Sequence, residues 1–379
     1  MSRLNVMTIL GTRPEIIRLA CVMEALDKAT NHTIVHTGQN YDYELNQIFF
    51  DDLGIRKPDH FMGVDTSSLG TVLGGILVET EKLLREHQPD AVVILGDTNS
   101  ALAGIMARRL KIPLYHMEAG NRCFDMNVPE ETNRRIIDHI SDFNLVYTEH
   151  ARRHLLAEGF PHRRIYVTGS PMREVLNRQM SRIDASNALQ ELNLTPQKYF
   201  LVSMHREENV DSPVHLSKLL QGLSNLAEGY GFPVVVSTHP RTQKRLDALE
   251  AETPEGIRFM KPFGFSDYNR LQKDAFCVIS DSGTISEESS ILRFPAVTIR
   301  NAIERPEALD TGSIVLTGTD PDRIIDCVRL VTGEHAVIPP CPTDYEIEDT
   351  SQRVVRLIAG TAQLTHRWMG IESPAESKS

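Results

Sequence analysis

The sequence predicts an α/β protein made of two Rossmann-like halves with a cleft between them. Short apolar runs alternate with amphipathic helical patterns from residue 6 to residue 359, which is the rhythm of a parallel sheet covered by helices. Polar motifs follow many of the apolar runs directly, and ligands of such sheets bind beyond the carboxyl ends of the strands. A chain of 379 residues is also long enough for two domains, each with its own core.

The first half opens with a predicted strand at residues 6–10, the motif GTRPE at 11–15 and a helix to about residue 26. Glycine permits the tight turn, and proline suits a first helical turn. Arg13 therefore projects from a strand-to-helix loop, where an anion can also use the helix N-terminus. Arg18, one turn further on, either faces the same site or is a solvated helix arginine. GTRPE is neither a dinucleotide fingerprint nor a Walker loop, so we expect no NAD or ATP.

The rest of this half continues the alternation. Apolar runs of three to five residues are typical of buried parallel strands, and longer periodic segments are typical of helices. The predicted strands lie at residues 34–36, 91–95, 112–115, 143–147 and 165–168. The predicted helices lie at residues 41–53, 69–86, 100–110 and 150–158, with another that begins at residue 129.

Three acidic residues mark the central stretch of this half, residues 91–135. Asp97 and Glu118 follow predicted strands, and Glu130 lies in the first turn of a predicted helix. Three carboxylates at one sheet edge are costly unless cationic or reactive groups accompany them, and Arg134 is one such partner. Each acid alone is explained as an N-cap or as half of an i,i+4 ion pair. Three within one βαβα unit favour a site.

The second half repeats the pattern after a connecting region at residues 169–197. Its predicted strands lie at residues 199–203, 234–237, 257–260, 276–279 and 296–300. Its predicted helices lie at residues 172–180, 185–192, 214–227, 285–292, 322–331 and 351–359. We therefore expect domains at residues 1–170 and 171–379, with a C-terminal helix that can pack back on the first.

The motif SDSGTISEESS, at residues 280–290, is the sharpest signal of the second half. A strand leads into a turn of small residues, and a helix begins at once. The N–H groups of Ser282, Gly283 and Thr284 would point at an anion there, and Glu288 or its neighbour could face a ribose. The alternative is a serine cap followed by acids that favour the helix dipole.

Cationic side chains end the neighbouring strands of this half. His205 and Arg206 follow one strand, His239 follows the next, and Arg305 follows the strand at 296–300. This concentration of donors near one helix N-terminus suits a diphosphate. The loop at 261–268 adds two aromatic residues that either flank a base or belong to the core, namely Phe263 and Tyr268.

The composition excludes several classes of protein. A formal charge of −11 disfavours nucleic acid and anionic membrane surfaces as partners. No apolar run reaches the roughly 18 residues of a membrane span, and the N-terminal run reads as a strand, not a signal peptide. The five cysteines are scattered without ligand spacing, so we expect reduced thiols, a cytoplasmic enzyme and no metal.

Seven motifs together resemble those of the non-hydrolysing UDP-N-acetylglucosamine 2-epimerase family. They are GTRPE, GDT, HMEAG, PEETNRR, HREEN, DSGTISEES and ERPEA, in this order between residues 5 and 315. The resemblance implies the GT-B fold, with UDP held mainly by the second domain. HTGQNYDYELN, HMEAGNRC and STHPRT look like the branch that makes UDP-N-acetyl-L-fucosamine from UDP-2-acetamido-2,6-dideoxy-β-L-talose. Asn121 and Cys123 stand where the wider family has leucine and threonine.

Carried over residue by residue, the resemblance implies that Asp97, Glu118, Glu130 and His205 are catalytic. The implied contacts to UDP or its phosphates are Arg13, His205, Ser282, Gly283, Thr284, Glu288 and Arg305. Arg18 stands where the wider family often has lysine, and Thr284 replaces a second glycine. The loop at 62–70 lacks the glutamine that contacts an activating second UDP-GlcNAc in bacterial relatives. The resemblance further implies a cytoplasmic homodimer without cofactor that serves surface polysaccharide synthesis, such as O-antigen or capsule.

The expected chemistry is elimination of UDP to a 2-acetamidoglycal, followed by re-addition. It needs one acid/base group for each face of C2. Asp97 and Glu118 are the expected pair, with Glu130 assisting, and the sequence leaves open which group takes the proton. The alternatives are a UDP-GlcNAc/UDP-ManNAc 2-epimerase, a GT-B glycosyltransferase and a nucleotide-sugar sensor without activity.

Overall fold

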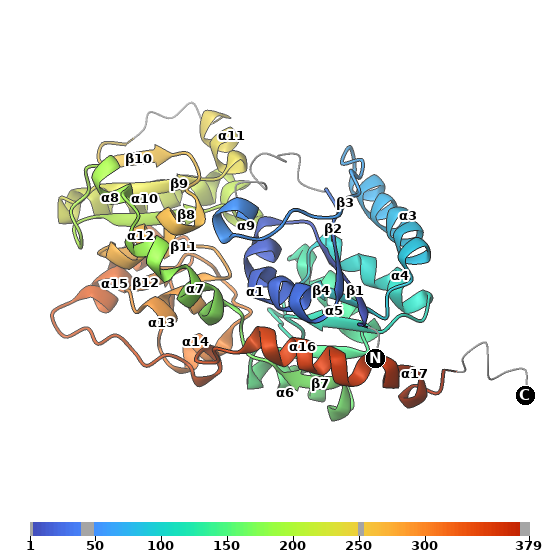
Figure 1. Cartoon of the computed structure of the whole chain (residues 1–379). Helices are drawn as coiled ribbons and strands as arrows, with labels where there is room; N and C mark the ends of the chain where they lie inside the picture. The colour runs from blue at the N-terminus through green and yellow to red at the C-terminus, as the bar shows by residue number, and fades with distance from the viewer. Residues whose placement is uncertain (1–2, 39–48, 249–253, 372–379) are drawn as a thin grey trace, which may run out of the picture. The chain divides into compact units, whose positions relative to one another are not determined.

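The chain forms two compact α/β units (Figure 1). The computed structural model describes residues 3–38, 49–248 and 254–371. The first unit comprises the chain up to Asn177 together with the segment from Ile347 onwards, and the second comprises Arg178–Glu346. Each unit has its own parallel sheet.

The sheet of the first unit has seven parallel strands in the order β3-β2-β1-β4-β5-β6-β7. The strands are β1 Asn5–Leu10, β2 Asn31–His36, β3 His60–Phe61, β4 Ala91–Leu95, β5 Leu114–Met117, β6 Phe143–Val146 and β7 Ile165–Val167. The order reverses between β1 and β4, and such switch points are where open α/β sheets bind their ligands.

Helices connect these strands and cover both faces of the sheet. They are α1 Arg13–Ala29, α3 Leu69–His87, η1 Asn99–Ala103, α4 Gly104–Arg109, α5 Pro129–Ile140, α6 Glu149–Ala157 and η2 His162–Arg164. The helix α7 Met172–Asp184 carries the chain into the second unit. Strand β4 is buried along its whole length, as expected for a strand covered on both sides.

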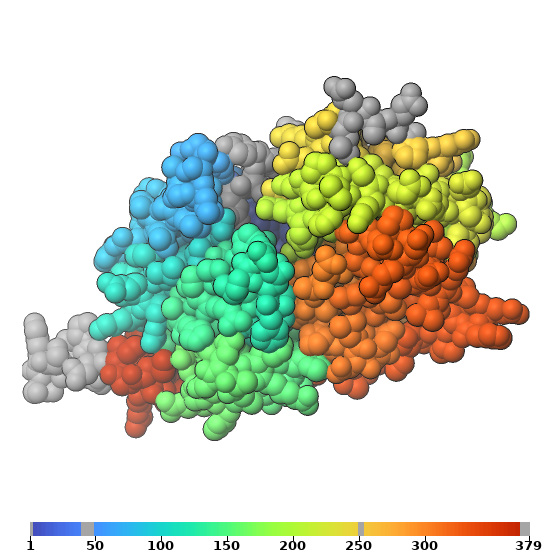
Figure 2. Space-filling view, turned by 180° about the vertical axis from the view of Figure 1, so that it is seen from behind, coloured from blue at the N-terminus to red at the C-terminus, as the bar shows by residue number. Residues whose placement is uncertain are grey.

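The C-terminal segment belongs to the first unit. It consists of α16 Thr350–Thr361, η4 Ala362–Leu364 and α17 Thr365–Trp368. Helix α16 packs on α1, and the buried Tyr115 hydroxyl lies 2.7 Å from Thr361 Oγ1. Seen from behind, the end of this segment shows in red beside the green part of the first unit (Figure 2). The first boundary therefore lies at Asn177 instead of residue 170. The C-terminal helix packs back on the first unit, as the sequence allowed.

The sheet of the second unit has six parallel strands in the order β10-β9-β8-β11-β12-β13. The strands are β8 Phe200–Met204, β9 Val234–Thr238, β10 Ile257–Met260, β11 Cys277–Ser280, β12 Ala296–Thr298 and β13 Val315–Leu316. The helices are α8 Ala188–Glu191, α9 Glu207–Val210, α10 Pro213–Tyr230, α11 Pro240–Ala248, α12 Phe265–Asp274, α13 Ile285–Leu292, α14 Pro306–Asp310, α15 Pro321–Thr332 and η3 Thr343–Tyr345. Here the order reverses between β8 and β11.

Local pattern predicted most elements, with specific exceptions. The loop prediction for residues 261–268 is wrong from Phe265 onwards, because α12 begins there after the N-cap Gly264. The helix predicted at 100–110 begins as the 3₁₀ turn η1. The two-residue strands β3 and β13 and the short helices α9, α11 and α14 were not predicted. Most of the helix predicted at 41–53 lies outside the described residues.

The cores of both units consist of strand residues packed against amphipathic helices. In the first unit Met7, Ile9, Val92 and Ile94 are fully buried, and in the second Val202 and Ile279 are too. Over the ranges that the structure describes, no helix is both long and apolar enough to cross a membrane.

Candidate active site

Several of the predicted site residues lie at the two points where strand order reverses. In the first unit, Arg13 begins α1 just after β1, and the turn after β4 carries Asp97. In the second unit, His205 and Arg206 follow β8, and the serine-rich turn follows β11. Because carboxyl ends of parallel strands share one edge, each pair of loops converges.

Asp97 is held by an arginine from α5. Arg134 donates from Nε and Nη2 to Asp97 Oδ2 at 3.0 and 2.5 Å, and Asn133 Nδ2 donates to the Asp97 carbonyl at 2.9 Å. The Asp97 side chain remains 24% exposed. The carboxylate is therefore fixed on one side and reachable on the other.

Glu118 is held in the same way by a different arginine. Arg18 Nη1 donates to Glu118 Oε2 at 2.9 Å, and Asn121 Nδ2 donates to Oε1 at 3.4 Å. Arg18 is buried, so it is not the solvated arginine of the alternative interpretation. Glu118 has a φ of 65°, a left-handed backbone that costs about 1 kcal/mol or more and is often found at functional sites.

Glycines on either side bring the two acids together. A Cβ on Gly96 would lie 4.0 Å from Glu118 Oε2, so this carboxylate lies beside the turn that leads to Asp97. A Cβ on Gly120 would lie 2.4 Å from the carbonyl oxygen of Ala151, so only glycine fits there. Sequence placed Asp97 and Glu118 at strand ends, and the structure brings them to one edge.

A buried aspartate, Asp138, holds the loop that follows Glu118. Asp138 lies 3.0 Å from His116 Nδ1 and accepts hydrogen bonds from Gly120 N at 3.2 Å and from Arg122 Nη1 at 2.7 Å. Burial alone would raise the pKa of Asp138, but the contacts with His116 and Arg122 lower it below its usual range. Asp138 is therefore a fixed negative charge that orders the loop.

The two adjacent glutamates at the start of α5 differ in environment. Glu130 is half-buried in the first turn, whereas Glu131 is fully buried. Arg135 pairs with Glu131 at 2.8 Å, as i,i+4 spacing predicts, and Arg134 contacts both Glu131 and Asp97. The sequence did not single out Glu131, because two adjacent glutamates in a first helical turn look alike and only burial distinguishes them.

The GTRPE motif contributes one half-buried cation and one buried acid. Arg13 lies with its guanidinium 5.3 Å from the Phe49 ring centroid. Glu15 is buried and accepts hydrogen bonds from Gly11 N at 3.2 Å and from the Ser100 hydroxyl. Burial raises the pKa of Glu15 to about 7. This residue, also missed from sequence, ties the loop after β1 to the turn after β4.

In the second unit a buried aspartate joins the two strand ends. Asp281 accepts hydrogen bonds from the backbone N–H groups of His205 and Arg206 at 3.0 Å and from Asn209 Nδ2 at 3.1 Å. The His205 ring lies 3.2 Å from the same carboxylate. Asp281 is completely buried, so it orients the β8 end and is not itself available to a ligand.

Two guanidinium groups meet at the glycine of the serine-rich turn. A Cβ on Gly283 would lie 2.9 Å from Arg305 Nη1 and 3.6 Å from Arg206 Nη2. Arg305 is 5% exposed and is held by Glu287 at 3.2 Å. The buried Nε of Arg206 has no hydrogen-bond partner among the described residues. Such a cluster suits a diphosphate, which binds several charged donors at once.

We expected three N–H groups of the serine-rich turn to point at an anion, and two of them are instead bonded within the turn. Ser282 N donates to Ser280 Oγ at 3.0 Å, and Thr284 N donates to Ser282 Oγ at 3.3 Å. These N–H groups are engaged within the turn, because serine side chains compete for local backbone donors. Glu288 is buried and accepts from Gln272 Nε2 at 2.7 Å.

The remaining predicted contacts of the second unit are exposed or half-buried. His239 is exposed, with its ring 5.9 Å from that of His205. Phe263 and Tyr268 are half-buried and pack against the core of the second unit, as the core interpretation predicted. Across the described ranges, no three His, Cys, Asp or Glu side chains cluster so that they could hold a metal ion.

Comparison with known proteins identifies the family. Residues 24–359 match the family model of UDP-N-acetylglucosamine 2-epimerase. An enzyme of that name from Methanococcus maripaludis is 38% identical over 329 residues, 85% of this chain and 90% of the relative. The solved structure of UDP-N-acetylglucosamine 2-epimerase from Rickettsia bellii is 47% identical with a TM-score of 0.92, covering 98% of this chain and 100% of that one.

A second solved structure adds a ligand. The Methanocaldococcus jannaschii UDP-GlcNAc 2-epimerase in complex with UDP-GlcNAc and UDP has a TM-score of 0.87 and 33% identity, covering 94% of this chain and 99% of that one. These likenesses extend over both units, each with a Rossmann-like parallel sheet, and the fold is of the GT-B type. The chain belongs to the non-hydrolysing UDP-N-acetylglucosamine 2-epimerase family and is a UDP-sugar 2-epimerase.

Proposed function

We propose that the enzyme inverts C2 of a UDP-activated 2-acetamido sugar by eliminating and re-adding UDP, with Asp97 and Glu118 as the acid/base groups. The observation that carries this proposal is the pair of carboxylates at adjacent strand ends, each held by its own buried arginine. Two acids fixed in this way suit proton transfer at two faces of one carbon.

The chemistry explains why two acids are needed. No carbonyl on the sugar ring acidifies the hydrogen at C2, so direct deprotonation is unfavourable. When the C1–O bond breaks, UDP leaves with the bonding electrons and C1 becomes electron-poor. One carboxylate then takes the C2 proton, giving a 2-acetamidoglycal. A proton delivered to the opposite face of C2, followed by attack of UDP at C1, yields the epimer with all atoms accounted for.

The cations of the second unit are proposed to stabilise the departing diphosphate. Arg206 and Arg305 approach each other at Gly283, and the His205 backbone is fixed by Asp281. Donors held in place before the reaction stabilise charge that develops in the transition state. Arg13 and Ser282 are proposed as further contacts.

The test uses the UDP-sugar without an acceptor in D₂O. We expect the epimer to carry deuterium at C2 by NMR, and prolonged incubation to release free UDP and the glycal. Product that kept all its original C2 hydrogen would refute the elimination route. A glycosyltransferase would give no turnover in this experiment, and a sensor would give binding alone.

We propose UDP-2-acetamido-2,6-dideoxy-β-L-talose as the substrate, converted to UDP-N-acetyl-L-fucosamine. The support is the likeness at Asn121 and Cys123, since Asn121 contacts Glu118 and Cys123 contacts Glu131. The likeness at residues 36–46 falls mostly outside the described residues. UDP-GlcNAc is the second candidate, favoured by the names of the relatives.

The ratio of kcat/KM for the two nucleotide sugars decides between these candidates. One methyl contact discriminates by only roughly 1–3 kcal/mol, so partial cross-reactivity is compatible with either. A preference for UDP-GlcNAc would overturn the deoxy-sugar proposal and leave the elimination mechanism intact.

The resemblance also supports proposals on regulation and assembly. Because the loop at 62–70 lacks the activator-contacting glutamine, we propose hyperbolic kinetics that added UDP-GlcNAc does not activate. A sigmoidal dependence that UDP-GlcNAc made hyperbolic would contradict this. We further propose a cytoplasmic homodimer that supplies surface polysaccharide synthesis, and light scattering of the purified protein tests the dimer.

A further inference from the structure

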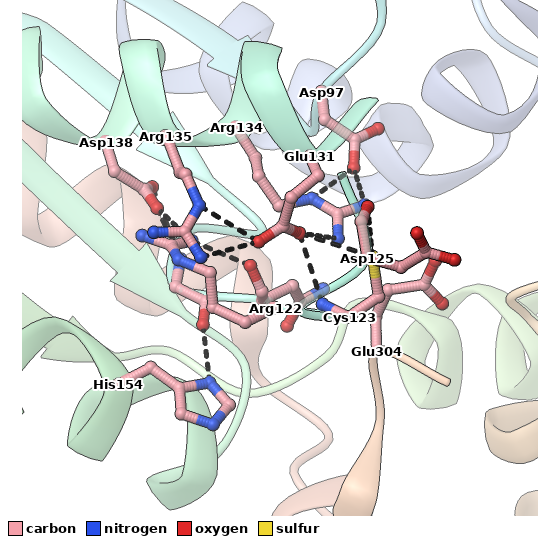
Figure 3. Close-up of polar contacts among 12 residues, drawn as sticks. Asp97, Arg122, Cys123, Asp125, Glu131, Arg134, Arg135, Asp138, His154 and Glu304 are labelled. Atoms are coloured by element: carbon pink, nitrogen blue, oxygen red, sulfur yellow. Dashed lines mark hydrogen bonds and ion pairs between the residues drawn. The ribbon is translucent and has the colours of Figure 1, made fainter. Parts of the chain in front are cut away.

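Glu131, a buried carboxylate outside the proposed acid/base pair, is linked to Asp97 through Arg134. The geometry points to Glu131 as a positioning residue that fixes the Asp97 carboxylate through Arg134. This inference rests on the proposed function, because it concerns how Asp97 is aimed for proton transfer at C2. Glu131 does not itself contact the Asp97 carboxylate (Figure 3).

Glu131 has no exposed surface, and both of its oxygens are engaged. Oε2 accepts from Arg134 Nη1 at 3.0 Å, from Cys123 N at 3.2 Å and from Cys123 Sγ at 3.3 Å. Oε1 accepts from Arg135 Nε and Nη2 at 3.0 and 2.8 Å. Figure 3 shows this carboxylate at the centre of the network, between the two arginines. Its position is therefore fixed from several sides.

Arg134 connects the fixed Glu131 carboxylate to Asp97. Its Nη1 is held by Glu131, while its Nε and Nη2 donate to Asp97 Oδ2. The guanidinium is planar and rigid, so anchoring one nitrogen fixes the direction of the other two. Both bonds to Asp97 go to a single oxygen, which leaves Oδ1 outside this pairing. Without Glu131, Arg134 could rotate and move the carboxylate.

Glu131 also balances the charge next to Asp97. Burial would raise its pKa, but the hydrogen bonds from Cys123 and Arg135 and the charge of Arg134 outweigh this and hold the pKa below its usual value. Glu131 is thus a carboxylate near neutral pH. The positive charge of Arg134 is therefore shared between two carboxylates, Glu131 and Asp97.

The network continues toward the other proposed acid. Arg135 Nη1 lies 3.4 Å from Glu158 Oε1, and Glu158 accepts from Arg122 at 2.8 and 2.7 Å. Arg122 contacts Asp138, which holds the N–H of Gly120 in the Glu118 loop. Buried ion pairs contribute little net stability compared with apolar packing, so positioning accounts for this arrangement better than stability does.

The test compares Glu131→Gln with the matched control Glu81→Gln, which alters an exposed ion pair with Arg85 on α3. We expect Glu131→Gln to lower kcat about 10- to 100-fold, the effect of a misplaced catalytic group, without changing the Kd for UDP measured by calorimetry. The primary isotope effect on kcat with C2-deuterated substrate should increase, because proton transfer becomes slower. A smaller fraction of folded enzyme would leave that isotope effect unchanged.

A folded Glu131→Gln enzyme with the kcat and isotope effect of the control would overturn the inference. If this variant does not fold by circular dichroism, Arg134→Lys replaces it, because lysine keeps the charge but cannot bridge both carboxylates as the guanidinium does. We then expect the same kcat loss and larger isotope effect, and their absence is equally decisive. Wild-type enzyme that fails to incorporate deuterium at C2 would instead refute the proposed function.

Discussion

Replacing Glu15 by glutamine should change how the stability of the first unit depends on pH. Glu15 is 1% exposed, and burial raises its pKa from 4.5 to about 7 despite hydrogen bonds from Ser100 and Gly11. The folded state therefore binds this proton more tightly than the unfolded state does. Its contribution to stability is fully present below about pH 4.5 and is lost as the pH rises through about 7.

The size of this contribution follows from the two pKa values. Each pH unit between them corresponds to about 1.36 kcal/mol, so the whole effect is about 3 kcal/mol, of which roughly 2–3 kcal/mol falls between pH 5 and pH 8. Glutamine has no proton to lose over this range, and its amide can still accept from Gly11 N. The free energy of unfolding of the variant should therefore lack this component.

The chain offers a probe that reports the first unit alone. It has a single tryptophan, Trp368 in α17, whose ring lies 6.5 Å from that of Phe143. Urea unfolding followed by tryptophan fluorescence at pH 5, 6, 7 and 8 gives the free energy of unfolding for wild type, Glu15→Gln and the control Glu81→Gln. The difference between Glu15→Gln and wild type should rise by about 2–3 kcal/mol in favour of the variant from pH 5 to 8. A difference that stayed constant or fell with pH would refute the reasoning, and the control should show no trend.

Three further substitutions test the site and its glycines. Asp97→Asn should abolish epimerisation while leaving the calorimetric Kd for UDP unchanged, and an equal loss of UDP binding would contradict the division of roles. Gly283→Ala places a methyl 2.9 Å from a guanidinium nitrogen and should weaken UDP binding in the same assay, whereas Gly229→Ala, with open space around its Cβ, should not. Gly120→Ala should lower the free energy of urea unfolding by about 1–3 kcal/mol more than Gly159→Ala does. Both glycines have positive φ, but only at Gly120 would the new methyl group meet a carbonyl oxygen. Equal losses would show that backbone strain alone matters.

The sequence predicted most strands and the positions of the proposed site residues at strand ends, because both depend on local sequence pattern. Residues 91–95, for example, are apolar throughout and are followed by Gly96 and Asp97. The strand, the turn and the acid after it can therefore all be predicted. The strands β3 and β13 were not predicted, because two residues are too few to show the alternation of apolar and polar residues that marks a strand. Helix α12 escaped because its apolar residues are few, which made residues 261–268 look like a loop.

Tertiary structure alone decided which charged groups meet. Arg18 and Glu118 are 100 residues apart in sequence and 2.9 Å apart in space, and Arg134 reaches Asp97 from another element. Neither pairing has a local signature, because any arginine on a helix has several acids within its reach. Burial separates Glu131 from Glu130 for the same reason, since adjacent residues in a first helical turn look alike until the neighbouring strands and loops cover one of them.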